Sequence, residues 1–117
     1  MKILGIDPGY DKLGVAVVEK LPKEKEKLIY SDCLKTNKSD DYFDRLKKLG
    51  ESLEKIIEFY KPTVLSIEKL FFTTNQKTAM RVSEVRGMII YLAKKNNLKI
   101  FEYTPLQVKS TIAGCGR

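Results

Sequence analysis

Short apolar runs and two long segments with a helical repeat alternate along the chain. The short runs are bounded by turn residues and are rich in Val, Ile and Tyr, a pattern typical of β-strands. We predict five strands, at residues 2–7, 13–18, 28–34, 64–67 and 98–103. Between the second and third strands, residues 20–27 alternate Lys and Glu around Pro22, which indicates a solvated hairpin tip.

The two long segments are predicted to be helices. The first follows Ser39, which we expect to be the N-cap, with Asp40 and Asp41 in the first turn, and it ends before Pro62. The second runs over residues 76–95. Its apolar positions are spread more widely than one stripe, so we expect it to bury two faces.

A third helix is predicted from Thr104 to about Gly114, because Thr, Pro and Gln stand at the N-cap, first and third positions. The order is then three strands followed by alternating helices and strands. A right-handed crossover would place strand 64–67 beside strand 2–7 and parallel to it. We therefore predict an α/β fold with a mixed five-stranded sheet, a three-strand antiparallel meander plus two parallel strands, flanked by helices.

The composition favours one domain with a polyanionic partner. The chain has 117 residues, enough for one core, and a net charge of +7 from 22 Lys and Arg against 15 Asp and Glu. Such an excess points to nucleic acid before a membrane surface, although a Lys-rich surface can also serve solubility alone. The sequence has no histidine, which excludes a His-based triad or a His metal ligand within these residues.

The two cysteines point to a reducing compartment. Cys33 and Cys115 lack the spacing of a metal site, and the sequence shows neither a signal peptide nor a long apolar span. We expect a cytoplasmic protein with no membrane segment.

The apolar run at the start of the chain ends on a carboxylate. Asp7 precedes Pro8 and Gly9. A residue before proline favours extended backbone, proline removes the next ladder donor, and glycine permits a sharp turn. We expect Asp7 at the tip of a stiff strand. An Asp before Pro-Gly is also a common turn opener, so this stretch alone leaves both interpretations open.

A second carboxylate, Glu68, ends the strand predicted at residues 64–67. If this strand lies beside the first and parallel to it, Asp7 and Glu68 meet at the edge where open α/β sheets bind ligands. Two carboxylates suit Mg²⁺, and a pair of such ions can hydrolyse a phosphodiester without a protein nucleophile. Glu68 could instead pair with Lys69 or another surface cation.

Several motifs, in order and at matching spacing, together resemble the RuvC family of bacterial Holliday-junction resolvases. They are Ile6-Asp7-Pro8-Gly9, Ile67-Glu68-Lys69-Leu70-Phe71-Phe72, Asn75, Arg86-Gly87, Phe101-Glu102-Tyr103 and Gln107-Val108-Lys109. The resemblance covers essentially the whole chain. It implies one RNase H-like nuclease domain over residues 1–117, a homodimer, and Mg²⁺-dependent nicking of opposed strands at four-way junction DNA in recombination and repair. It also implies work alongside a branch-migration helicase.

The resemblance assigns roles to individual residues. It makes Asp7 and Glu68 the first two of the family's four metal-binding positions, and Phe71 the aromatic that stacks on a base at the crossover. The remaining expected DNA contacts are Phe72, Asn75, Arg86 and Lys109. The helix at residues 76–95 corresponds to the family's dimer helix, with Met80, Val85, Gly87 and Met88 expected at the interface.

The family's last two metal ligands lie in a further helix, beyond the point that corresponds to residue 117. We therefore expect this sequence to be C-terminally incomplete, the complete protein to hold two Mg²⁺ ions, and residues 1–117 alone to be inactive.

Three other interpretations stay open. A non-catalytic DNA-binding fragment of the same fold would share the basic charge. A small monomeric resolvase-like nuclease would share the first strand motif, but the broad apolar surface of helix 76–95 favours a dimer. An actin-like ATPase domain also opens with a strand, an Asp and a Gly turn, but it needs two such domains and gives Phe71 and Phe72 no role.

Overall fold

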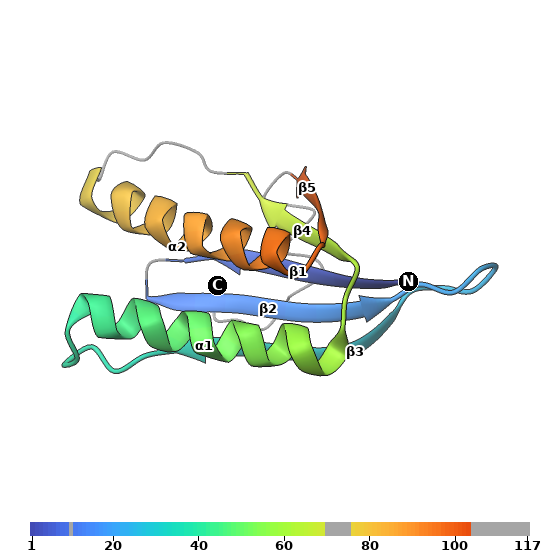
Figure 1. Ribbon diagram of the computed structural model, residues 1–117, viewed down its shortest axis with the longest axis horizontal. Helices are drawn as coiled ribbons and strands as arrows, with labels where there is room; N and C mark the ends of the chain where they lie inside the picture. The colour runs from blue at the N-terminus through green and yellow to red at the C-terminus, as the bar shows by residue number, and fades with distance from the viewer. Residues whose placement is uncertain (10, 70–75, 104–117) are drawn as a thin grey trace.

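The computed structural model describes residues 1–9, 11–69 and 76–103. These residues form five strands and two helices (Figure 1). The strands are β1 (Lys2–Pro8), β2 (Lys12–Glu19), β3 (Lys27–Lys35), β4 (Val64–Glu68) and β5 (Lys99–Tyr103), and the helices are α1 (Tyr42–Tyr60) and α2 (Gln76–Lys95). The predicted strands are all confirmed, with ends that differ by at most one residue. The predicted third helix lies outside the described residues.

The strands form one mixed sheet in the order β3-β2-β1-β4-β5. β1 pairs antiparallel with β2, and β2 pairs antiparallel with β3. β4 lies parallel to β1, and β5 lies parallel to β4. The meander, the parallel pair and the crossover are therefore as predicted.

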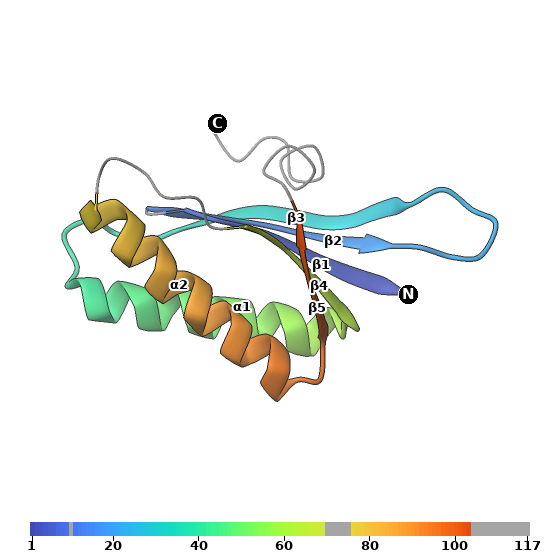
Figure 2. The same cartoon turned by 90° about the horizontal axis from the view of Figure 1, so that it is seen from above.

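Both helices pack on the same face of the sheet (Figure 2). Apolar side chains of alternate strand positions meet one face of each helix there, and each fully buried one contributes about 1.5–3 kcal/mol of burial free energy. The strand residues of this core are Leu4, Ile6, Leu13, Val15, Val17, Leu65 and Ile67. The helix residues are Leu49, Leu53, Ile56, Ile57, Val85, Ile89, Leu92 and Ala93.

Strand alternation places the two carboxylates on the other face. Leu4 and Ile6 face the helices, so Gly5 and Asp7 point the opposite way. In β4 the same argument places Glu68 on that face, because Ile67 belongs to the core. Both carboxylates thus lie on the face of the sheet that α1 and α2 do not cover.

The start of α1 differs from the prediction. The N-cap is Asp41, whose carboxylate accepts a hydrogen bond from the Phe43 backbone N–H at 3.0 Å. Ser39 is instead held in a turn, because its N–H and its hydroxyl both donate to Asn37 Oδ1, at 3.0 and 2.8 Å. This local Asn turn competes with capping and moves the helix start to Tyr42.

The bounds predicted for α2 are confirmed, but its burial is narrower than predicted. One face, carrying Val85, Ile89, Leu92 and Ala93, is buried. Met80 and Tyr91 are 67% and 63% exposed. Four other apolar residues are half-buried, namely Ala79, Val82, Met88 and Ile90, so α2 has one fully buried face within the described residues.

Candidate active site

Asp7 and Glu68 meet at the end of the parallel β1–β4 pair. Their preceding residues, Ile6 and Ile67, are register partners, and each strand continues beyond that pair. The two carboxylates therefore leave neighbouring strands at the same level and on the same face of the sheet. Pro8 ends β1 one residue later, as its missing N–H requires.

Asp7 is buried and Glu68 is half-buried. Asp7 is only 2% exposed, and Asp7 Oδ1 and Glu68 Oε2 are both buried oxygen atoms. The register partner of Asp7 in β2 is Gly14, which adds no side chain beside the carboxylate. Oxygen donors in such a site suit a hard divalent cation, whose charge compensates the hydration that buried carboxylates lose.

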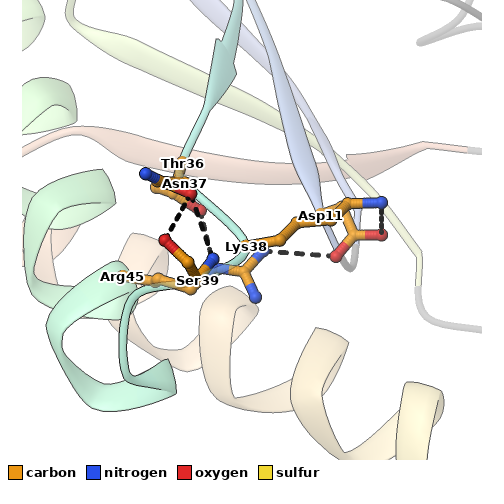
Figure 3. A network of polar contacts seen from close by, with 6 residues as sticks. All are labelled: Asp11, Thr36, Asn37, Lys38, Ser39 and Arg45. Carbon is orange, nitrogen blue, oxygen red and sulfur yellow. Dashed lines mark hydrogen bonds and ion pairs between the residues drawn. The ribbon is translucent and has the colours of Figure 1, made fainter.

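An arginine of α1 anchors the turn that follows Asp7. Arg45, with a side chain only 11% exposed, contacts Asp11 Oδ1 at 3.2 Å through Nη2 and donates from Nε to Thr36 Oγ1 at 2.8 Å. Lys38 lies 3.8 Å from the other Asp11 oxygen. Figure 3 shows these contacts joining the β1–β2 turn to the β3–α1 connection and the first turn of α1. The network ties the residue before β2 to the helix layer.

A second arginine, from α2, anchors the strand end that carries Glu68. Arg86 forms an ion pair with Glu102 of β5, and its Nε lies 3.5 Å from the backbone carbonyl of Glu68. The Lys69 N–H donates to the Tyr103 carbonyl at 3.0 Å and extends the β4–β5 pairing past Glu68. Sequence reasoning assigned Arg86 to DNA, and it missed Arg45 entirely, because neither contact has a local sequence signal.

Three other acidic side chains of the described residues have partners of their own. Asp11 pairs with Arg45, Glu102 pairs with Arg86, and Asp32 accepts from the Tyr30 hydroxyl at 3.1 Å. Within residues 1–9, 11–69 and 76–103, no group of three or more His, Cys, Asp or Glu side chains could hold a metal ion. Asp7 and Glu68 are thus a two-carboxylate site in this part of the chain.

Four of the predicted DNA contacts, Phe71, Phe72, Asn75 and Lys109, lie outside the described residues. The fifth, Arg86, has a side chain 17% exposed. Its guanidinium contacts the Glu102 carboxylate and the Glu68 carbonyl.

The predicted dimer residues divide into two groups. Met80 and Gly87 are exposed, and a Cβ added to Gly87 would meet nothing within 4 Å. Val85 is 2% exposed and belongs to the core, and Met88 is half-buried against Gly50 of α1. Tyr91, one turn after Gly87, extends the exposed surface that Met80 begins.

The sequence matches the family model of crossover junction endodeoxyribonuclease RuvC over residues 3–117. The chain belongs to the RuvC family. Its members are metal-dependent nucleases of the RNase H-like α/β fold. The RuvC protein of Petrotoga mobilis is 43% identical over 117 residues, which cover all of this chain and 71% of the relative. That of Caldicellulosiruptor saccharolyticus is 44% identical over all of this chain and 70% of the relative.

Solved structures of RuvC proteins have the same fold. Thermus thermophilus RuvC is 27% identical with a TM-score of 0.78, over 97% of this chain and 70% of that one. The T. thermophilus protein in complex with a Holliday junction substrate gives a TM-score of 0.83 at 24% identity, over 94% and 70% of the two chains. Among the described residues of the present chain, no helix is long and apolar enough to cross a membrane.

Proposed function

We propose that this chain forms the nuclease core of a structure-selective endodeoxyribonuclease that nicks opposed strands of Holliday junctions in recombination and repair. One observation carries the proposal: in a chain of the RuvC family, Asp7 and Glu68 stand side by side at the carboxyl edge of the sheet. The actin-like ATPase interpretation is not favoured, because the family match spans residues 3–117.

In the proposed site, Asp7 and Glu68 hold Mg²⁺, and the complete protein holds two such ions. The donor set fits, since both ligands are carboxylates on stiff strand ends and Mg²⁺ prefers oxygen. When bound, the ions supply a hydroxide-like nucleophile and stabilise the leaving oxygen of the phosphodiester. The protein contributes fixed ligand directions, and the buried position of Asp7 limits access of bulk water.

We further propose that the protein acts as a homodimer through the exposed side of α2. Met80, Gly87 and Tyr91 lie on one side of this helix, two turns and then one turn apart, with the exposed Glu84 between the first two. A two-fold axis would present two sites to a junction that itself has two-fold symmetry. Val85 belongs to the core and Met88 packs against it, so we propose that they stabilise α2 from behind this surface.

DNA contacts are proposed mainly on residues outside the described ones. Phe71 is proposed to stack on a base at the crossover, Phe72 and Asn75 to contact the DNA, and Lys109 to meet a phosphate near the cut. The net charge of +7 supports a phosphate-binding surface. We also propose that the protein is located in the cytoplasm and that it works together with a branch-migration helicase.

The test uses an extended chain, defined as residues 1–117 followed by the remaining C-terminal part of the P. mobilis relative. Residues 1–117 are proposed to be one domain that lacks the family's last two metal ligands, so the addition should complete the site. With Mg²⁺, the extended chain is expected to nick a four-way junction on two opposed strands and to leave linear duplex of the same sequence intact. Junction binding without cutting would instead favour a non-catalytic DNA-binding module.

A further inference from the structure

Arg86 links three elements at the end of the sheet that carries Glu68. It comes from α2, its ion-pair partner Glu102 is in β5, and the carbonyl 3.5 Å from its Nε belongs to the last residue of β4. Its side chain is 17% exposed, so these contacts are partly screened from water.

The contact between Arg86 and the Glu68 carbonyl lies at the last residue of β4. Glu68 ends β4, and within the described residues the pairing with β5 continues past it through the Lys69 N–H bond to the Tyr103 carbonyl. The direction of the Glu68 side chain depends on the orientation of the peptide units on either side of its Cα. A donor on the Glu68 carbonyl, from the helix side of the sheet, fixes one of those units while the carboxylate points to the opposite face.

We propose that Arg86 is a positioning residue for Glu68. By holding the Glu68 carbonyl and Glu102 together, it fixes the direction in which the Glu68 carboxylate meets the metal. This inference rests on the proposed metal site at Asp7 and Glu68. Outer-shell partners of metal ligands typically change metal affinity by about 10–100-fold when removed.

Charge alone would give the opposite result. Arg86→Met removes a cation near a cation site and leaves Glu102 in place, so simple electrostatics predicts tighter binding of a divalent ion. Loss of positioning predicts weaker binding. The sign of the change therefore separates a positioning role from a background charge.

The experiment measures Mn²⁺ affinity of the 117-residue chain by the loss of the free-ion electron paramagnetic resonance signal. Asp7→Asn and Glu68→Gln establish which binding belongs to the site. Arg86→Met is expected to weaken that binding by about tenfold or more. Arg86→Lys keeps the charge but cannot span both partners, and it should give an intermediate loss. The matched control is Lys95→Met, which removes an ion pair with Glu54 at the far end of α2 and should leave Mn²⁺ affinity unchanged.

A charge swap separates positioning from general stability. The double variant Arg86→Glu with Glu102→Arg restores an ion pair between α2 and β5, but a glutamate cannot donate to the Glu68 carbonyl. We expect it to recover the melting temperature and not the Mn²⁺ affinity.

Two outcomes would overturn the proposal for Arg86 alone: wild-type affinity in Arg86→Met, or full recovery of affinity in the swap. If the wild-type chain shows no Mn²⁺ binding that depends on Asp7, the proposed metal site fails, and the role of Arg86 fails with it.

Discussion

Asp7 and Glu68 each follow one member of the same register pair, Ile6 and Ile67, on adjacent parallel strands. Their side chains leave the sheet on the face opposite α1 and α2. An arginine of each helix contacts the backbone or a side chain near these strands: Arg45 pairs with Asp11, just before β2, and Arg86 Nε lies 3.5 Å from the Glu68 carbonyl. The backbone of Glu68 is therefore contacted directly from the helix layer, whereas Arg45 acts on the start of β2.

Removing either carboxylate should abolish cutting and spare the fold. In the extended chain, Asp7→Asn and Glu68→Gln keep side-chain size but lose a ligand charge, and loss of one such group typically costs about 10²–10³ in rate. We expect at least that loss in junction nicking with Mg²⁺, measured in single-turnover assays on a labelled junction.

The control for this prediction is the far-UV circular dichroism spectrum together with the melting temperature, both of which should stay close to wild type. A variant that keeps its fold and still nicks at the wild-type rate would remove that residue from the metal site.

Arg45 should matter for stability much more than its neighbour Lys48. The Arg45 side chain is 11% exposed and contacts both Asp11 and Thr36, whereas the Lys48 side chain is 58% exposed and pairs with Asp40. We expect Arg45→Met to lower the free energy of unfolding by about 1.5–3 kcal/mol, because it removes the charge-assisted hydrogen bond to Asp11 and the donor to Thr36. Lys48→Met removes an exposed ion pair and should change the free energy of unfolding far less than Arg45→Met does.

Urea unfolding of the two variants, followed by circular dichroism, measures both values. Equal effects of Arg45→Met and Lys48→Met would mean that the Asp11 network does not stabilise the β1–β2 turn.

Strand order was predictable because it follows from local patterns and one topological rule. The apolar runs define the strands, and the right-handed crossover places β4 beside β1. The helix start was not predicted correctly, since Ser39, Asp40 and Asp41 are all good N-caps, and only the Asn37 turn selects Asp41. The roles of Arg45 and Arg86 depend on partners far away in the sequence, and no spacing rule reveals such contacts.

Gly87 offers a sharp test of the proposed dimer. Because nothing lies within 4 Å of an added Cβ, the isolated chain accommodates a side chain there, and replacing a helical glycine gains up to about 1 kcal/mol. Gly87→Arg should therefore raise the melting temperature of the monomer and block close approach of a second α2. Sedimentation at roughly tens of micromolar should show dimer for the wild type and monomer for the variant.

Gly87→Ala is the matched control, since it gains the same helix propensity and adds only a methyl group. It should stay dimeric. A wild-type chain that sediments as a monomer, or a Gly87→Arg variant that stays a dimer, would place the interface elsewhere or remove it.

Phe71 lies outside the described residues, and its stacking role stays a prediction from the family resemblance. If it stacks on an unpaired base, Phe71→Ala should weaken junction binding by about 1–3 kcal/mol and leave duplex binding and the melting temperature unchanged. Competition binding with labelled junction and duplex measures the difference. A strongly lowered melting temperature, with equal loss on both DNAs, would identify Phe71 as a core residue.

The 117-residue chain alone should bind junction DNA and cut it negligibly. Its described residues bring only Asp7 and Glu68 to the edge, and two carboxylates hold one Mg²⁺ weakly through its waters. In-line hydrolysis by the two-metal route needs a second ion. The missing ligands should therefore lower the nicking rate by far more than the factor of about 10²–10³ that one lost group typically costs.

Junction binding by the 117-residue chain should fall steeply with salt, by about one counterion for each neutralised phosphate, given the net charge of +7. Comparing the 117-residue chain with the extended chain on the same junction measures both properties. Equal nicking rates would mean that an acid within residues 1–117 completes the site, and binding that stays flat between low and moderate salt would exclude a phosphate-binding surface.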